Sequence, residues 1–128
     1  MDFDPTKEGH VMVAAKSGLY EFQDGEFIKC YNRNNSPFLS CVNDDNYILV
    51  SDLMYDKEGT LWVFNSSVEN CFWTLDKNQQ WKSLDVCSQI KYNDDLRCLF
   101  ISSTNNKMWF LSNYWQTSQL YAYDYINN

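Results

Sequence analysis

The residue best suited to acid–base chemistry in this chain is its single histidine, His10. A histidine that acts as a general base or a metal ligand needs partners, and no serine or cysteine motif points to His10. It follows the turn residue Gly9 at the start of an apolar run, so we expect either a solvated histidine or a histidine at a strand edge. The sequence predicts no catalytic residue, no cofactor and no metal ligand.

Two carboxylate-rich loops, residues 43–46 and 56–59, offer the hard oxygen ligands that calcium prefers. Neither has the spacing of an EF-hand, and Asp and Asn side chains commonly cap their own backbone in turns. We therefore expect ordinary turns at both places. Paired carboxylates for glycoside hydrolysis would have to lie a few ångströms apart across a groove, which no spacing in this sequence indicates.

The chain contains five cysteines, none of them in a C-x-x-C pair: Cys30, Cys41, Cys71, Cys87 and Cys98. With one histidine in the chain, this pattern argues against a structural zinc site. We expect the cysteines to be small buried hydrophobic residues. Their odd number argues against a complete disulfide framework.

Composition places the chain among small folded domains of short strands. It has 128 residues and an aromatic share of 17%, and turn residues separate its apolar runs. The formal net charge of −7 disfavours nucleic acid as a partner. No apolar run has the ~18–20 residues of a membrane helix, so we expect no membrane contact. The acidic start of the chain lacks the apolar core of a signal peptide.

An internal repeat dominates the sequence. Residues 7–13 read KEGHVMV and residues 57–63 read KEGTLWV, and a weaker third copy, NNKMWF, occupies 105–110. Further along, LYEF at 19–22 matches FWTL at 72–75 and LYAY at 120–123. Each copy with its flanking apolar runs forms a unit of four short strands, which is typical of one blade of a β-propeller. An immunoglobulin-like sandwich is the competing architecture, but it does not account for the recurrence.

The predicted fold class is therefore all-β, with about two and a half to three four-stranded antiparallel blades of a β-propeller. The whole chain, 1–128, forms this partial propeller, with blades at about 1–38, 47–85 and 96–128. A stub around Phe3 is all that remains of the first strand of the first blade. We expect eleven strands, at 10–15, 18–22, 27–31, 47–50, 52–56, 61–65, 71–75, 81–84, 96–102, 107–112 and 119–124. The fourth and fifth are either separate strands or one strand interrupted at Ser51 and Asp52.

Aromatic residues fall into two groups. Trp62 and Trp109 occupy the same repeat position, so we expect them to pack between blades. Tyr114 and Trp115 lie in a polar stretch, 112–119, between two strands of the third blade. They are the candidate contacts with a sugar or a partner, and packing at the blade edge is the alternative.

Loop lengths suggest where recognition takes place. In each blade the turns between the first and second and between the third and fourth strands are short, and they share one end of the blade. The long, irregular connections share the other end: 32–46, 65–70, 85–95 and 112–119. Because binding residues gather on long loops, we expect recognition at that second end.

The central blade carries a family resemblance. Residues 56–65 read DKEGTLWVFN, close to the pattern Asp-x-x-Gly-Asn-Leu-Trp-(Ile/Val)-x-(Thr/Asn), while SGLYEF at 17–22 and NSPF at 35–38 fit neighbouring parts of the repeat. The chain thus resembles the two-component regulator propeller repeat, although Met12 replaces the tryptophan in the first blade and Asn106 the glycine in the third. The resemblance implies a non-catalytic, periplasmic or otherwise extracytoplasmic sensor module of a Bacteroidetes hybrid two-component system. It further implies polysaccharide fragments as the signal, an oligosaccharide as the ligand, and a histidine kinase domain elsewhere in such a protein.

Two other functions remain open. Asn65 and Ser66 after the tryptophan, and Asp76 followed by Trp81, look like propellers of type nine secretion systems, which would make the chain a scaffold. A propeller lyase or glycosidase would need His, Asp, Glu or Arg residues converging at the propeller centre, and one histidine counts against it. Because propellers close with about four to eight blades, we expect homo-oligomers through open blade faces or terminal strands.

Overall fold

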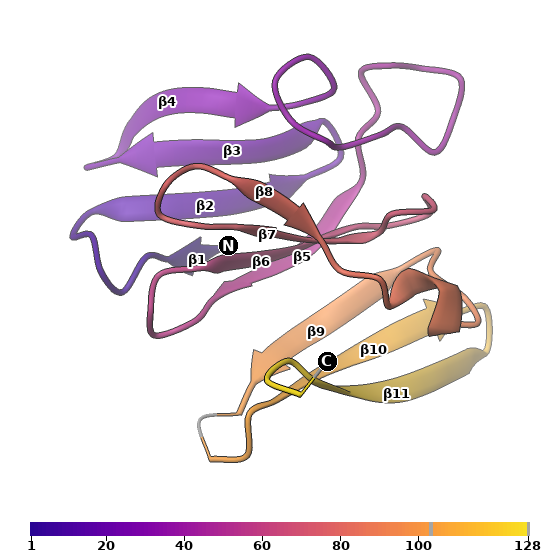
Figure 1. Ribbon diagram of the computed structural model, residues 1–128. Helices are drawn as coiled ribbons and strands as arrows, with labels where there is room; N and C mark the ends of the chain where they lie inside the picture. The colour runs from indigo at the N-terminus through magenta and orange to yellow at the C-terminus, as the bar shows by residue number, and fades with distance from the viewer. Residues whose placement is uncertain (103, 128) are drawn as a thin grey trace.

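A computed structural model describes residues 1–102 and 104–127, and it shows three antiparallel sheets in succession (Figure 1). In every sheet, strands adjacent in the sequence pair with one another. The first sheet holds β1 (Asp2–Phe3), β2 (His10–Ala15), β3 (Gly18–Gln23) and β4 (Glu26–Tyr31). The second holds β5 (Val50–Tyr55), β6 (Leu61–Asn65), β7 (Phe72–Leu75) and β8 (Trp81–Ser83). The third holds β9 (Leu96–Ile101), β10 (Lys107–Tyr114) and β11 (Thr117–Asp124).

The fold class predicted from the sequence is confirmed. Each sheet is a meander, and the first strands lie nearest one another, because β5 contacts both β1 and β9. This is the arrangement of successive blades in a propeller-like fold. Within the described residues, the one helical element is a short 3₁₀ turn, η1 (Cys87–Gln89).

The alternative of one strand interrupted at Ser51 and Asp52 is confirmed, whereas the predicted loop 112–119 is wrong. Residues 50–55 form the single strand β5, and the irregularity at Ser51 is a break in register between Val50 and Asp52. In the third blade β10 and β11 run to Tyr114 and from Thr117, so the expected loop 112–119 shrinks to a two-residue turn. Polar side chains extend this hairpin because backbone pairing does not depend on apolar side chains.

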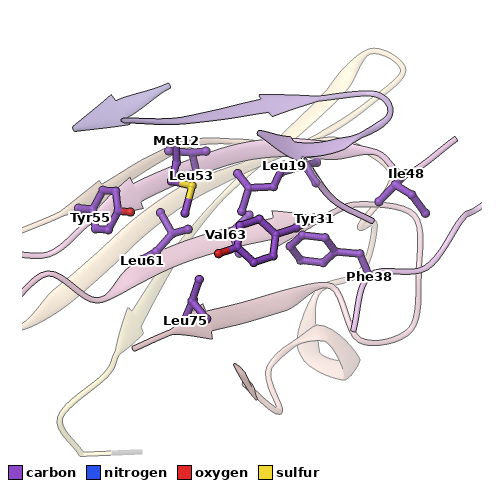
Figure 2. Close-up of a cluster of buried hydrophobic side chains, with 11 residues drawn as sticks. Met12, Leu19, Tyr31, Phe38, Ile48, Leu53, Tyr55, Leu61, Val63 and Leu75 are labelled. Atoms are coloured by element: carbon purple, nitrogen blue, oxygen red, sulfur yellow. The ribbon is translucent and has the colours of Figure 1, made fainter. Parts of the chain in front are cut away.

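The sheets pack through alternating side chains. Every residue of β6 is buried. Leu61 and Val63 pack toward the first sheet, whereas Trp62 and Phe64 pack toward the third. The first of these two cores lies between the first two sheets (Figure 2) and is formed by Met12, Leu19, Tyr31, Phe38, Ile48, Val50, Leu53, Tyr55, Leu61, Val63 and Leu75.

Side chains at equivalent positions of the first two repeats point the same way, toward the next sheet along the chain. Met12 packs against the second sheet and Trp62 against the third, where it is 8% exposed. Trp109 takes the same repeat position but is only partly buried, because it pairs with Phe100 and Ala122 on the face of the third sheet away from the second. The expectation of interblade packing thus holds for Trp62 and not, within this chain, for Trp109.

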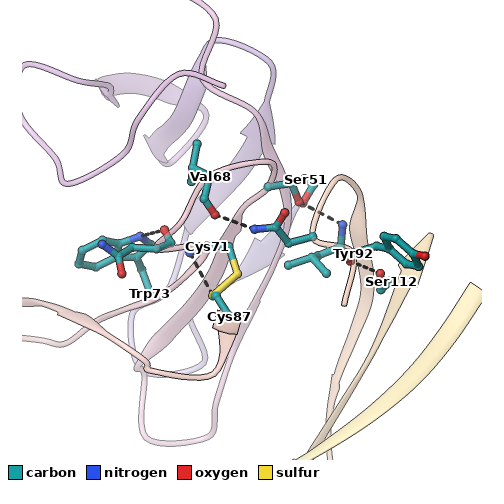
Figure 3. Close-up of a disulfide and its surroundings, with 11 residues drawn as sticks. Ser51, Val68, Cys71, Trp73, Cys87, Tyr92 and Ser112 are labelled. Atoms are coloured by element: carbon teal, nitrogen blue, oxygen red, sulfur yellow. Dashed lines mark hydrogen bonds between the residues drawn. A yellow bond between two sulfur atoms is a disulfide. The ribbon is translucent and has the colours of Figure 1, made fainter. Parts of the chain in front are cut away.

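The cysteines differ from the prediction. Cys71, which precedes β7, and Cys87 of η1 are both buried, and they form a disulfide that ties the central blade to the linker toward the third (Figure 3). Cys98 is exposed and free, while Cys30 and Cys41 are half-buried and free. The expected set of buried thiols is therefore wrong, although an incomplete disulfide framework agrees with the odd cysteine count.

The disulfide predicts a large effect of reduction. It links residues 16 positions apart, and closing a loop of that size stabilises a protein by about 3 kcal/mol. We expect dithiothreitol, or the double change Cys71→Ala and Cys87→Ala, to lower the free energy of unfolding by about that amount in urea titrations. Cys98→Ser is the control, because its thiol is exposed and unbonded. An unfolding midpoint unaffected by reductant would contradict the prediction.

Candidate functional site

A cluster of buried polar side chains lies between the first two sheets. His10 begins β2 on the same strand face as Met12, so it points at the second sheet rather than at solvent. It is 6% exposed, and the expected solvated histidine is therefore wrong. Glu21 of β3 pairs in register with Met12 and shares its face.

Glu21 accepts hydrogen bonds on both carboxylate oxygens. His10 Nε2 lies 2.7 Å from Oε1, and the Tyr31 hydroxyl donates to Oε2 at 2.9 Å. Burial alone would raise the pKa of Glu21, but the hydrogen bonds from His10 and Tyr31 outweigh it, and the pKa is lowered. Burial, together with the hydrogen bond to Glu21, raises the pKa of Tyr31. Glu21 is therefore a carboxylate, and Tyr31 is a neutral donor.

The other side of the histidine ring is held less closely. Its Nδ1 lies 3.4 Å from the Tyr55 hydroxyl and 3.5 Å from Asp4 Oδ2. Both distances exceed those of ordinary protein hydrogen bonds. Burial first, and then the neighbouring charge of Asp4, raises the pKa of Tyr55, so its hydroxyl keeps its proton. His10 Nδ1 thus faces the Tyr55 hydroxyl and Asp4 Oδ2 at longer range than Nε2 faces Glu21.

A cavity of about 320 Å³ adjoins this cluster. Three turns approach one another around it, because a Cβ at Gly59 would lie 2.6 Å from Thr6 Oγ1 and 2.8 Å from Lys77 Cε. Gly59 has a φ of +82°, a conformation that suits glycine. The lining is mixed in character: Asp4, Thr6, Lys7, His10, Met12, Glu21, Tyr55, Gly59, Leu61, Leu75, Asp76, Lys77 and Gln79.

The polar groups beside this cavity form hydrogen bonds with one another. A histidine paired with a carboxylate is part of many acid–base sites, but here the short pair of His10 and Glu21 is buried between sheets. Among residues 1–102 and 104–127, no group of three or more His, Cys, Asp or Glu side chains is placed to hold a metal ion.

The two aromatic residues singled out from the sequence lie at the other end of the blades, at the β10–β11 turn. Tyr114 ends β10, and its ring stacks on Tyr92 at 4.1 Å between centroids. Trp115 stands in the turn with a φ of 49° and is 91% exposed. The structure thus places Tyr114 in edge packing and leaves Trp115 uncovered, and it brings neither residue near the His10 cavity.

Trp115 predicts a stabilising substitution. A bulky residue with positive φ is strained by about 1–3 kcal/mol, whereas glycine adopts this conformation freely. We expect Trp115→Gly to raise the free energy of unfolding by about 1 kcal/mol in urea titrations. Gln116→Gly, one residue further in the same turn, is the control and should give no such gain. A destabilised Trp115→Gly variant would show that the indole contributes to the fold.

Sequence reasoning missed Glu21, Tyr31 and Tyr55, although a signal was present. Leu19 and Glu21 have the same parity on one strand, so a strand that buries Leu19 must also bury a carboxylate. A buried carboxylate requires a partner. His10 has the matching parity on the paired strand, so the pair could have been found from the register alone.

The structure contains no described helix long and apolar enough to cross a membrane.

The three meandering sheets and their two interblade cores define the class of the protein, a partial propeller-like β fold. No protein-family model matches the chain, and no curated protein matches it. Among solved structures the chain is similar to PorZ, described as an essential bacterial surface component of the type-IX secretion system of Porphyromonas gingivalis. The TM-score is 0.77 with 21% sequence identity, and the match covers 93% of this chain and 16% of that chain. This likeness shows the fold, whereas membership of the two-component regulator propeller family stays a prediction.

Proposed function

We propose that this chain is a non-catalytic segment of an extracytoplasmic propeller that acts as a scaffold in a secretion assembly of the type-IX kind. The observation that carries the proposal is the fold likeness to PorZ over 93% of the chain. Because the chain spans 16% of PorZ, it corresponds to a few blades of such a protein. A fold does not fix a function, so the proposal needs a direct test.

The disulfide supports the proposed location. Disulfides form and persist in oxidising compartments such as the bacterial periplasm and cell surface. The bond between Cys71 and Cys87 is buried, as expected of a structural disulfide rather than a catalytic one. PorZ is itself described as a surface component. A periplasmic or surface location follows for this chain as part of the proposal.

The scaffold role is preferred over the sensor role for one reason. The likeness to PorZ points to a secretion system, whereas the sensor role and its oligosaccharide ligand rest on the repeat pattern alone. The enzyme alternative has less support, since the short histidine–carboxylate pair is buried between two sheets.

Gene deletion in the bacterium that carries this gene tests the proposal. We expect proteins bearing a type-IX sorting signal to accumulate in the periplasm and to disappear from the medium. A plasmid copy of the gene should restore secretion. Quantitative mass spectrometry of the two fractions measures the effect, and periplasmic proteins without the sorting signal provide the control.

Two results would overturn the scaffold role. Normal secretion together with a lost transcriptional response to added polysaccharides would make the protein a sensor. Saturable turnover of a polysaccharide by the purified chain, abolished by one carboxylate substitution, would make it an enzyme.

A further inference from the structure

We propose that β11 binds an extended segment of a partner protein, which adds a fourth strand to the third blade and inserts an aromatic side chain into the cleft beside Tyr123. This inference goes beyond the scaffold role and does not depend on it. The first two sheets have four strands each, whereas the third has three among residues 1–102 and 104–127, with β11 at its outer edge (Figure 1). The place that β4 and β8 take in the first two blades is therefore open beside β11.

Half of the backbone of β11 faces this open edge. The backbone N–H of Asn113 donates at 2.9 Å to Asp95, which directly precedes β9. Backbone groups alternate in direction along an antiparallel strand, so Tyr114 faces β11 and its register partner Thr117 faces β10. The N–H and C=O groups that point away from β10 are then those of Ser118, Leu120 and Ala122. An extended segment beside them would pair with each of these groups in turn.

The edge of β11 lacks the features that protect an exposed strand edge. Proteins commonly keep edge strands short, charged or bulged, which prevents unwanted pairing. β8 has three residues including Lys82, and β4 has Glu26, Lys29 and a register shift against β3. β11 has eight residues in unbroken register with β10, and its one charged residue is Asp124 at its end. The blade that has room for another strand thus also has the edge best suited to pair with one.

A cleft of about 440 Å³ lies next to this edge. The second blade contains the filled counterpart of this cleft. There Trp81 of β8 packs on Tyr31 at the end of β4 and on Phe38 in the linker that follows, with ring centroids 5.6 and 5.0 Å apart. The cleft likewise joins β11 to the end of β8 and the linker that follows, and its lining is Tyr123, Lys82, Ser83, Leu84, Asp85, Val86 and Gln89.

Strand register determines which residue of the partner enters the cleft. Trp81 pairs with Leu75 of β7. Leu75 and Tyr123 end the matching segments 72–75 and 120–123. A strand added to β11 therefore places the residue opposite Tyr123 where Trp81 lies in the second blade. An aromatic residue there extends the core between the second and third blades, against which Tyr121 and Tyr123 already pack.

A peptide with the sequence of residues 77–85, KNQQWKSLD, tests the site, because within the chain this segment pairs with β7, the counterpart of β11. Added to the ¹⁵N-labelled chain, it should give saturable chemical-shift changes at the backbone amides of β11 and of Leu84 and Val86. We expect a dissociation constant on the order of 100 μM. The same peptide with Trp81→Ala is the control and should bind at least about tenfold more weakly. Absence of saturable shifts, or equal affinity of the two peptides, would overturn the proposal.

Two pairs of variants separate backbone pairing from the cleft. Ala122→Pro removes an N–H that points at the open edge, so it should abolish binding while β10 and β11 stay paired, whereas Ala122→Val keeps the N–H and should bind like the parent chain. Ser83→Trp fills the cleft from β8 and should weaken binding about tenfold. Ser88→Trp is its matched control, because Ser88 is an exposed serine outside this cleft. Parent-like affinity in both Ala122→Pro and Ser83→Trp would contradict the site.

Photo-crosslinking in the bacterium identifies the source of the strand. Benzoylphenylalanine incorporated in place of Ser118 should join the protein to a different polypeptide. Mass spectrometry of the joined peptide should then show a segment with an aromatic residue. A crosslink within one polypeptide, a crosslink between two copies of this chain, or no crosslink at all would overturn the assignment to a partner protein.

Discussion

Replacement of Glu21 by alanine is expected to lower the free energy of unfolding by about 1–3 kcal/mol, because it leaves the buried His10 Nε2 without its acceptor and the Tyr31 hydroxyl with Gln79 Oε1 alone. His10 and Tyr31 are both buried between the first two sheets, at 6% and 3% exposed. Urea titration followed by tryptophan fluorescence measures the change. Glu26→Ala is the matched control, because Glu26 is an exposed glutamate of β4, and it should change stability by less than about 0.5 kcal/mol.

The Glu21 effect should also depend on pH in a defined direction. The folded protein lowers the pKa of Glu21 below its ordinary value of 4.5. Its contribution to stability is therefore complete above pH 4.5 and is lost as the pH falls through the folded-state pKa. The stability difference between the parent chain and Glu21→Ala should shrink in acid. A difference of equal size at neutral and acidic pH would show that Glu21 acts through packing alone.

The blade architecture could be predicted from the sequence because it depends on local patterns that repeat. The glycine turn and apolar triplet at 59–63 recur at 9–13, and both copies form strands that begin just after the turn. Side-chain alternation within each copy then fixes which residues face the neighbouring blade. The shared direction of Met12 and Trp62 follows from this register.

The buried cluster was harder to predict because it depends on pairing between strands. His10 reads as a polar residue at a strand start, and only the pairing of Met12, two residues further along its strand, with Glu21 shows that His10 and Glu21 both face inward. The contact with Tyr55 crosses between blades and joins residues 45 positions apart. Such a contact has no local signal, because it is set by how two sheets stack.

The disulfide and the β10–β11 hairpin show two further limits. Cys71 and Cys87 meet because the linker after β8 turns back over β7. The irregular sequence 84–95 contains no pattern that predicts this turn. Ser112 to Gln119 looks like a loop by composition, yet its backbone pairs up to Tyr114 and Thr117. Composition reports which side chains tolerate solvent, whereas strand length is set by backbone hydrogen bonds.

The largest effect of a single substitution on assembly is expected at Trp109. Produced as a separate chain, these 128 residues should self-associate, because two blade faces are uncovered. On the third blade, Phe100 and Leu120 are 57% and 64% exposed beside Trp109, while on the first blade Phe3 and Phe27 are 60% and 57% exposed.

The two uncovered faces are complementary in kind. Trp109 occupies the same repeat position as Met12 and Trp62, and each of those two residues packs against the blade that follows its own. The outer face of the first blade corresponds to the faces that receive such contacts. Head-to-tail contact between two chains would therefore reproduce the interblade packing seen within one chain. Covering roughly 500 Å² of blade face is worth on the order of 10 kcal/mol before the cost of association.

Sedimentation velocity at micromolar concentration tests this prediction. The parent chain should form dimers or larger assemblies, and Trp109→Glu should shift them to monomers, because a carboxylate in an apolar interface has no partner. Trp115→Glu is the matched control: it introduces the same charge at an exposed tryptophan in the turn, outside both blade faces, and should leave association intact. A parent chain that stays monomeric at tens of micromolar, or a Trp109→Glu variant that associates equally well, would show that these blade faces do not recognise one another.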